Sequence, residues 1–283
     1  IDSYLIFTRR GVDIDSYHAI KEYLKQFRKR LAPCPPNRKD GEDWPGRKRG
    51  TYHWYEIQDA VDYYNVFEQP RIHSTKISLY PAFSFSQEVL YASNTSYILP
   101  VADAQVGYYL LGLLNSHICE YFCRQVFSAK ANGYYEIQPG RLADFPIPDA
   151  PAAERDAIGT LAMQITDAAR ARYALHQRVR HRIQSDVGTP GTQLTQKLTR
   201  WWELDFPAFR TEVQKVFKRN IPLKERDDWE AWLAAQREQH DQHTAQIVQW
   251  ETGLNARVYA LFGLSPAEIT LIEERTKYRS GEV

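Results

Sequence analysis

The spacing of apolar residues predicts a chain that changes character about half-way along its length. Residues 52–101 contain short apolar and aromatic runs separated by Pro- and Asn-rich breaks, a pattern typical of β-strands. Beyond residue 150 the strand signal stops, and long segments with helical spacing follow, rich in Ala, Arg, Gln and Glu. The pattern predicts an α+β protein with an N-terminal mixed α/β domain, 1–150, followed by an all-α C-terminal helical region, 151–283.

The first part is expected to open with a basic helix and to contain several short strands. Asp15 or Ser16 is expected to cap this helix, which continues to Leu31, where a run of prolines ends it. A largely buried helix is predicted over 106–127, with a break near Asn115. Strands are predicted around Ile72 and at 77–80, 83–85, 89–91 and 97–99.

The second part is predicted to be built from long helices. They are expected at 152–186, near 192–200, at 205–218 and from 224 to about 250. Near the C-terminus, Ser265, Pro266 and Glu268 have the spacing of a helix cap, a first-turn proline and a capping-box glutamate.

Composition supports a folded protein and excludes a membrane span. Hydrophobic residues make up 43% of the 283 residues and charged residues 25%, which suffices for a sizeable core. No run of about 18 apolar residues occurs, and no secretory pattern follows Ile1, so a cytoplasmic location is expected. Because Met163 is the only methionine, the chain is also expected to be a piece of a longer protein.

The cysteines predict neither a disulfide framework nor a metal centre. There are three of them, an odd number that is too small for a disulfide scaffold. Cys119 and Cys123 stand one helical turn apart near His117, but a fourth ligand at a suitable spacing is missing. Ordinary packing is the interpretation we favour for both side chains.

Charge is distributed unevenly although the formal net charge is only +1. Residues 21–49 contain ten Lys or Arg and four Asp or Glu. A basic stretch on an otherwise neutral protein suits a phosphate-facing surface. A solvated helix face followed by a charged loop explains the same residues, and the sequence alone leaves both interpretations open.

The usual catalytic signatures do not occur in the sequence. No Gly-rich loop follows a predicted strand in the pattern that holds a nucleotide or an adenosyl cofactor. The motifs G-x-S-x-G and H-E-x-x-H are also missing. A chain of this kind is expected to bind rather than to catalyse.

Five sequence blocks in the first part together carry a resemblance to a known family. They read WYEI, FEQPRI, NTSYILP, LLGLLNS and RLADFPIP, at 54–57, 67–72, 94–100, 110–116 and 141–148. In this order and spacing they resemble the TaqI-like C-terminal specificity domain. That domain is the target-recognition part of adenine-N6 DNA methyltransferases and of fused type IIG restriction–modification enzymes. The segment 255–269 is similar to the ends of such large fused proteins.

The chain departs from that family in lacking its catalytic half. The family's Asn-Pro-Pro-aromatic motif has no counterpart, because the nearest string, CPPN at 34–37, has the wrong order. The resemblance implies that this fragment chooses a site on duplex DNA, while missing methyltransferase or endonuclease domains of the same parent chain carry out the chemistry. S-adenosylmethionine, and Mg²⁺ for any nuclease, are implied for that parent, and no cofactor is expected in this fragment.

Candidate DNA-binding residues are basic, amide or aromatic side chains in loops and at strand ends. They are Arg47, Lys48, Arg49, Arg71, Lys76, Arg124, Lys130, Asn132 and Tyr134. Two other functions stay open from the sequence. The helices after 151 can form a protein-interaction module that docks a partner subunit of a DNA-modifying or phage-defence complex, and the chain can be an enzyme whose site has no familiar motif.

Overall fold

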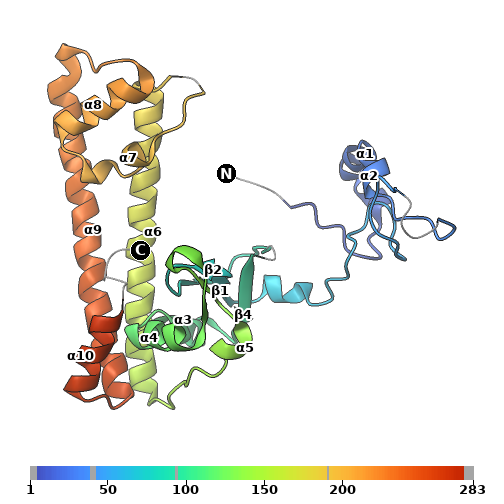
Figure 1. Ribbon diagram of the computed structural model, residues 1–283, viewed down its shortest axis with the longest axis horizontal. Coiled ribbons are helices and arrows are strands. Elements are labelled where there is room, and N and C mark those ends of the chain that lie inside the picture. Colours follow the sequence, from blue (N-terminus) through green and yellow to red (C-terminus); the bar gives the residue numbers. More distant parts are fainter. Residues whose placement is uncertain (1–4, 39–42, 93–94, 190, 277–283) are drawn as a thin grey trace. The chain divides into compact units, whose positions relative to one another are not determined.

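The computed structural model describes residues 5–38, 43–92, 95–189 and 191–276. The chain divides into two compact units (Figure 1). Unit 1 contains Ile1–Gln69 and Glu88–Tyr91, and unit 2 contains Pro70–Gln87 and Ala92–Val283. Residues 39–42 of the basic stretch lie outside the described residues.

Unit 1 consists of short helices joined by long loops. The helices are η1 (Ile14–Ser16), α1 (His18–Lys25), α2 (Arg28–Leu31) and η2 (Tyr64–Glu68). The single helix predicted up to Leu31 is wrong, because the chain turns at Gln26 and Phe27 and divides it into α1 and α2. The predicted cap is also wrong, since Asp13 caps η1 and Tyr17 precedes α1 without a side-chain cap.

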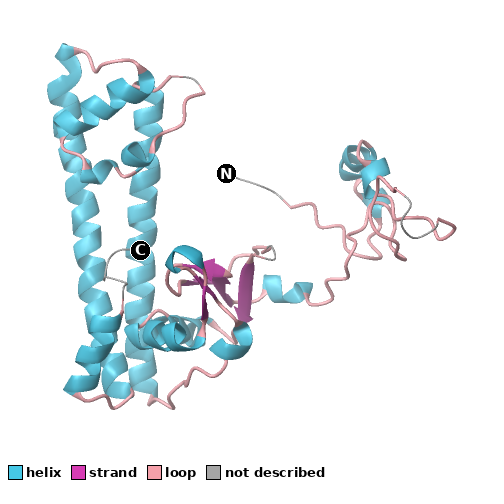
Figure 2. Cartoon of the chain, viewed as in Figure 1, coloured by secondary structure: helices cyan, strands magenta, loops and turns pink. Residues whose placement is uncertain are grey.

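Unit 2 contains two small antiparallel sheets (Figure 2). In the first, β1 (Arg71–Thr75) lies between β3 (Phe83–Ser86) and β4 (Ser96–Pro100), with Ile72 opposite Phe85 and Leu99. In the second, β6 (Tyr135–Glu136) lies between β2 (Ile77–Ser78) and β5 (Ser128–Ala129). Five strands were expected from the sequence, and four of them correspond to β1, β2, β3 and β4. The strand predicted at 89–91 is wrong, and β5 and β6 are too short for a periodicity to reveal them.

Three helices follow the first sheet: α3 (Ala104–Leu114), α4 (His117–Val126) and α5 (Pro139–Leu142). The predicted break near Asn115 is confirmed, and Ser116 caps α4 through the N–H of Cys119. The Asn115 side chain forms two hydrogen bonds with the backbone of Phe83, each 3.0 Å long. The helix break therefore connects α3 to strand β3.

The rest of unit 2 is helical, which confirms the predicted fold class. Two long antiparallel helices, α6 (Ala152–Asp186) and α9 (Arg226–Leu261), run side by side (Figure 1). Between them along the chain come α7 (Gln196–Thr199), η4 (Trp201–Glu203), α8 (Phe206–Phe217) and η5 (Leu223–Glu225). The capping box at Ser265 and Glu268 is confirmed and begins α10 (Pro266–Arg275). Throughout the described ranges, no helix combines the length and the apolar character needed to cross a membrane.

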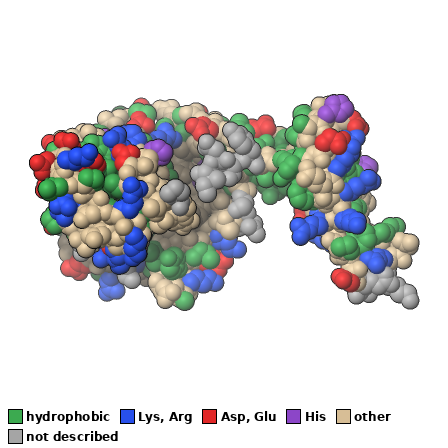
Figure 3. Space-filling model, turned by 90° about the horizontal axis from the view of Figure 1, so that it is seen from above, with side chains coloured by type: hydrophobic (Ala, Val, Ile, Leu, Met, Phe, Trp, Pro, Cys, Tyr) green, Lys and Arg blue, Asp and Glu red, His purple; other side chains and the backbone are tan. Residues whose placement is uncertain are grey.

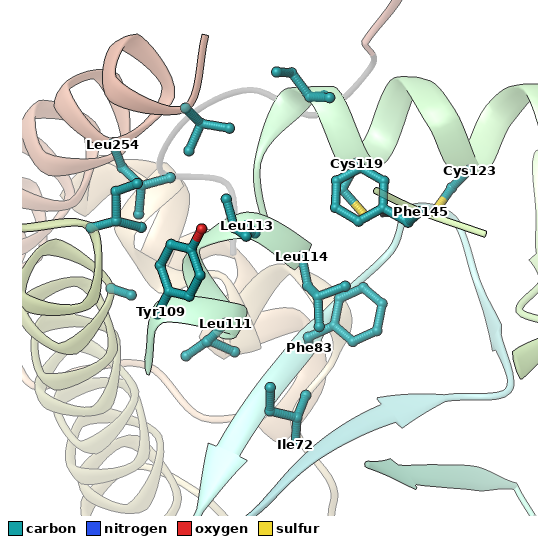
Figure 4. Packing of buried hydrophobic residues seen from close by; sticks show 14 of the residues in the cluster. Ile72, Phe83, Tyr109, Leu111, Leu113, Leu114, Cys119, Cys123, Phe145 and Leu254 are labelled. Carbon is teal, nitrogen blue, oxygen red and sulfur yellow. Dashed lines mark hydrogen bonds between the residues drawn. The ribbon is translucent and has the colours of Figure 1, made fainter. Parts of the chain in front are cut away.

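Two separate hydrophobic cores stabilise unit 2. The first core joins the first sheet and helices α3 and α4 to the N-terminal part of α6 and the C-terminal part of α9. Ile72, Leu113 and Leu254 therefore belong to one cluster (Figure 4). The second lies where α7 and α8 cover the other end of the α6–α9 pair, around Trp201 and Phe209. The structure becomes all-helical near residue 150, whereas the two compact units divide after residue 69. The division into domains 1–150 and 151–283 stays a prediction.

Cys119 and Cys123 belong to the first core. Their Sγ atoms lie 3.9 Å apart, and both side chains are buried. Burial raises the pKa of the Cys119 thiol well above its ordinary value. Across the part of the chain that is described, His, Cys, Asp and Glu side chains do not gather into a group that could hold a metal ion.

A histidine pair lies beside the second core, where α6 faces α9. Nε2 of His176 lies 2.9 Å from Nδ1 of His240, and the Trp202 ring stacks on His176 at a centroid distance of 4.0 Å. Burial, the neighbouring His240, and Arg180 and Arg172 lower the pKa of His176 to about 4. Burial also lowers the pKa of His240.

We expect this pair to make unit 2 less stable in mild acid. Because the folded pKa of His176 is lower than its ordinary value of 6.5, the unfolded chain takes up the proton first as pH falls. The contribution of neutral His176 to the free energy of unfolding is therefore fully present above about pH 6.5. It is lost as the pH falls from there to about pH 4. Urea unfolding at a series of pH values tests this. His176→Gln should flatten that part of the profile, whereas His181→Gln, at an exposed position of α6, should leave it unchanged.

Candidate nucleic-acid interface

The second sheet of unit 2 carries an exposed hairpin with a tight tip. Strands β5 and β6 are joined by residues 130–134, and the N–H of Lys130 donates to the carbonyl of Tyr134 at 2.7 Å. Asn132 and Gly133 both have positive φ, 61° and 79°, which favours Asn and Gly at these positions. A Cβ on Gly133 would meet nothing within 4 Å, so the tip projects into open space.

Two lysines stand beside this hairpin and share one carboxylate. Nζ of Lys130 lies 2.7 Å from Glu136, and Nζ of Lys76, which directly precedes β2, lies 3.7 Å from it. Lys130 and then Lys76 lower the pKa of Glu136. Both lysines remain partly exposed, with Asn132 and Tyr134 exposed close by in the chain. The fold therefore brings Lys76 to the hairpin that carries Lys130, Asn132 and Tyr134.

Two other predicted contact residues in unit 2 have structural partners instead. Arg124 pairs with Glu120 and donates to the hydroxyl of Tyr135 at 2.7 Å, and its side chain is only 9% exposed. It thereby attaches α4 to strand β6. Arg71 is 0% exposed in the centre of the first sheet, and burial lowers its pKa. Neither side chain is presented to a ligand in this conformation, so we leave both out of the interface.

Arg47, in unit 1, has a set of partners that the sequence did not indicate. Its guanidinium donates to the carbonyls of Leu31 at 2.6 Å, Glu56 at 2.7 Å and Trp54 at 3.0 Å, and it lies over the Tyr52 ring. Its backbone N–H also donates to the carbonyl of Ala32, and its own carbonyl accepts from the N–H of Cys34. Arg47 thus connects three stretches of backbone within unit 1.

Glu56 is a second organising residue of unit 1 that sequence reasoning missed. Its buried carboxylate accepts the backbone N–H groups of Gly11 and His53, each at 2.7 Å. Burial by itself would raise the pKa of Glu56, but the two N–H donors outweigh it and the pKa is lowered. The block WYEI contained this residue, yet spacing alone could not show which backbone groups it would meet.

Lys48 and Arg49 are the exposed members of the basic triplet. Nζ of Lys48 lies 2.9 Å from Asp59, with both side chains exposed, and Arg49 donates to the carbonyl of Arg38 at 2.6 Å. The glycine before the triplet serves internal packing, because a Cβ on Gly46 would lie 2.3 Å from the carbonyl of Ala32. Lys and Arg side chains are spread over the visible face of unit 1 (Figure 3). Lys48 and Arg49 are thus the members of the triplet whose charge is presented to solvent.

Comparison with known families decides what the first half of the chain is. Residues 8–147 match the TaqI-like C-terminal specificity domain. This segment is a TaqI-like specificity domain. It includes described parts of unit 1 and the sheets of unit 2, together with all nine residues predicted to bind DNA. Its function is DNA target recognition in restriction–modification systems. The individual contacts stay a prediction.

The helical part matches a different family. Residues 151–258 match a domain of unknown function (DUF8810). The two matched segments meet at the proline-rich segment 146–151, where the sequence changes from mixed to helical structure. No curated protein matches the chain.

Proposed function

We propose that this chain is the DNA-reading part of a restriction–modification enzyme whose other domains methylate adenine at N6, as in the type IIG enzymes. The match of residues 8–147 to the specificity domain carries the proposal. Target recognition and chemistry occupy separate parts of such a protein, and the sequence contains no cofactor or catalytic motif. S-adenosylmethionine, with Mg²⁺ for any cleavage, therefore belongs to the proposed parent protein, and we assign no residue of this chain to either.

Within the specificity domain, we assign DNA contact first to the β5–β6 hairpin. A narrow turn with open space at its tip can enter a groove, as two-stranded ribbons do in the major groove. Lys76 and Lys130 would then face phosphates, because an ammonium group is a point charge without a bidentate fork. Asn132 and Tyr134 are exposed at the tip and would approach base edges. Lys48 and Arg49 would add phosphate contacts from unit 1.

Selection of duplexes from a random library, followed by titration at several salt concentrations, tests the proposal. We expect one short motif to be enriched, and we expect Lys76, Lys130, Lys48 and Arg49 together to contribute about −4 to the slope of log affinity against log salt. Lys76→Ala with Lys130→Ala should weaken all sequences alike and make the slope less steep by about 2. Asn132→Ala should instead cost about 1–3 kcal/mol on the selected motif alone, if its amide reads a base.

A matched control is the pair Lys197→Ala and Lys224→Ala, two exposed lysines in the helical region. It removes the same charge outside the specificity domain and should leave binding nearly unchanged. A chain that enriches no motif, or binds without salt dependence, would contradict the proposal. The alternative, a protein-interaction module built from the helices after 151, stays a prediction, and capture of a partner protein without any DNA binding would favour it.

A further inference from the structure

The second half of α6 contains an unusual concentration of arginine. Between residues 168 and 185 it has five arginines and no Asp or Glu. Two of them are used inside the fold: Arg172 is buried and donates to Thr244, and Arg180 donates to the carbonyl of Thr199. The other three, Arg170, Arg178 and Arg182, are exposed.

These three exposed arginines form one row on the helix surface. Their spacings of eight and four residues place them on an i±4 ridge, roughly 12 Å and 6 Å apart along the axis. Arg170 is 3.9 Å from Asp167 and Arg182 pairs with Asp186, so acids stand only at the two ends of the row. The remaining exposed positions in the row's neighbourhood are uncharged or histidine, including Tyr173, Gln177 and His181. We name this surface, Arg170, Arg178 and Arg182, the arginine row.

The partner helix has the opposite charge on its exposed positions. From 227 to 250, α9 exposes five acids, Asp227, Asp228, Glu230, Glu238 and Asp241. Its only Lys or Arg in this range, Arg237, is half-buried and donates to the carbonyl of Leu204. The exposed charges of the helical pair are therefore basic on residues 168–185 of α6 and acidic on residues 227–250 of α9. A surface whose only role is to be hydrated does not require its positive and negative charges to lie on different helices. A polyanion, by contrast, would be attracted to the basic helix and repelled by the acidic one.

The arginine row begins beside the second sheet, which carries the β5–β6 hairpin. Arg170 and Tyr173 line a cavity of about 450 Å³ together with Tyr80 and Pro81, which follow strand β2. Strand β2 pairs with β6, the strand that ends the hairpin, and Lys76 directly precedes it. All of these residues belong to unit 2. The row thus extends away from the proposed reading hairpin along the helix.

We propose that the arginine row of α6 binds the phosphate backbone of DNA that flanks the recognised site. This inference rests on the proposed function and adds a second contact surface, in the segment that matches a domain of unknown function. The occupant is duplex DNA because its phosphates provide regularly spaced negative charge along a length comparable with the row. The contact carries no base information; it adds affinity and fixes the orientation of the helical pair on the duplex.

The test compares the full chain with two double variants on long and short duplexes that contain the selected motif. Arg170→Ala with Arg178→Ala removes two members of the row that have the weakest contacts within the protein. We expect the salt slope to become less steep by about 2 and affinity at 0.1 M salt to fall roughly tenfold or more on duplexes with long flanks. On a duplex trimmed to the motif, the variant should bind like the unchanged chain.

The matched control is Lys215→Ala with Arg219→Ala, which removes the same charge from exposed positions at and beyond the end of α8. It should keep the full salt slope and the preference for long flanks. Circular dichroism and tryptophan fluorescence of both variants should match those of the unchanged chain. The inference is overturned if the row variant keeps its slope, or if both variants lose affinity equally. If the unchanged chain itself fails to bind DNA, the proposed function fails and this inference with it.

Discussion

Replacing Arg47 by alanine is expected to loosen unit 1 rather than to remove a DNA contact. Three backbone carbonyls, those of Leu31, Trp54 and Glu56, would lose a charged donor at once. Hydrogen bonds to charged groups contribute about 1.5–3 kcal/mol each, and these three are partly exposed, so a combined loss of about 3 kcal/mol is expected. Hydrogen exchange in the full chain measures this, because the amides of Cys34 and Ile57 are hydrogen-bonded within unit 1.

Arg49 provides the comparison. It stands two positions away, is exposed and donates to the carbonyl of Arg38, so Arg49→Ala should cost less than about 1 kcal/mol in exchange protection. Arg47→Lys should recover little, since an ammonium cannot reproduce the planar fork that reaches separate carbonyls. Unchanged exchange in Arg47→Ala together with weaker DNA binding would return Arg47 to the interface.

The second large effect is expected from Phe209→Ala in the core between α6, α8 and α9. Phe209 is fully buried and stacks on Trp229 at a centroid distance of 5.9 Å. Truncation of a buried Phe costs about 3–5 kcal/mol, because apolar contacts are lost and a cavity remains. Four of the seven tryptophans, Trp201, Trp202, Trp229 and Trp232, belong to this core or pack against it. Tryptophan fluorescence during urea unfolding therefore measures the loss directly.

The position of Phe209 also predicts which part of unit 2 keeps its stability in this variant. The first core, around Leu113 and Leu254, is a separate cluster, so exchange protection of α3 and α4 should change less than that of α8. Tyr173→Ala, at a side chain that is 63% exposed on α6, is the aromatic control and should leave the unfolding midpoint nearly unchanged. Equal loss of protection in both cores would show that they unfold as one cooperative unit.

Local signals in the sequence were sufficient to predict the positions of most helices of unit 2. Helical periodicity placed α6 with the bounds the structure has, and a cap residue with a compatible glutamate marked the start of α10. Unit 1 was harder to predict, because Glu56 and Arg47, rather than a periodic apolar face, organise its loops. The strand predicted at 89–91 failed for a related reason. Its apolar residues pack as a loop, with Tyr91 against Phe7 and Phe67.

The residues of the candidate site also fall into two groups, those whose exposure the sequence indicated and those whose surroundings it could not show. Residue type and position in the chain already indicated Lys130, Asn132 and Tyr134, since a Gly-containing turn after a buried helix is a natural place for exposed polar side chains. Sequence could not separate these from Arg71 and Arg124, which have the same chemistry but lie within the fold. Nor could it show that the five arginines between residues 168 and 185 divide into two internal residues and an exposed row.

What the sequence determined by itself was the order of elements, the fold class and the family of residues 8–147, because these depend on patterns within short stretches of chain. Only the tertiary structure decided which charged groups are free to meet a ligand. Whether a guanidinium faces solvent or a backbone carbonyl depends on segments far away in the chain, as Arg47 and Leu31 illustrate. Burial and hydrogen bonding are properties of those long-range contacts, and identical residues therefore acquire different roles.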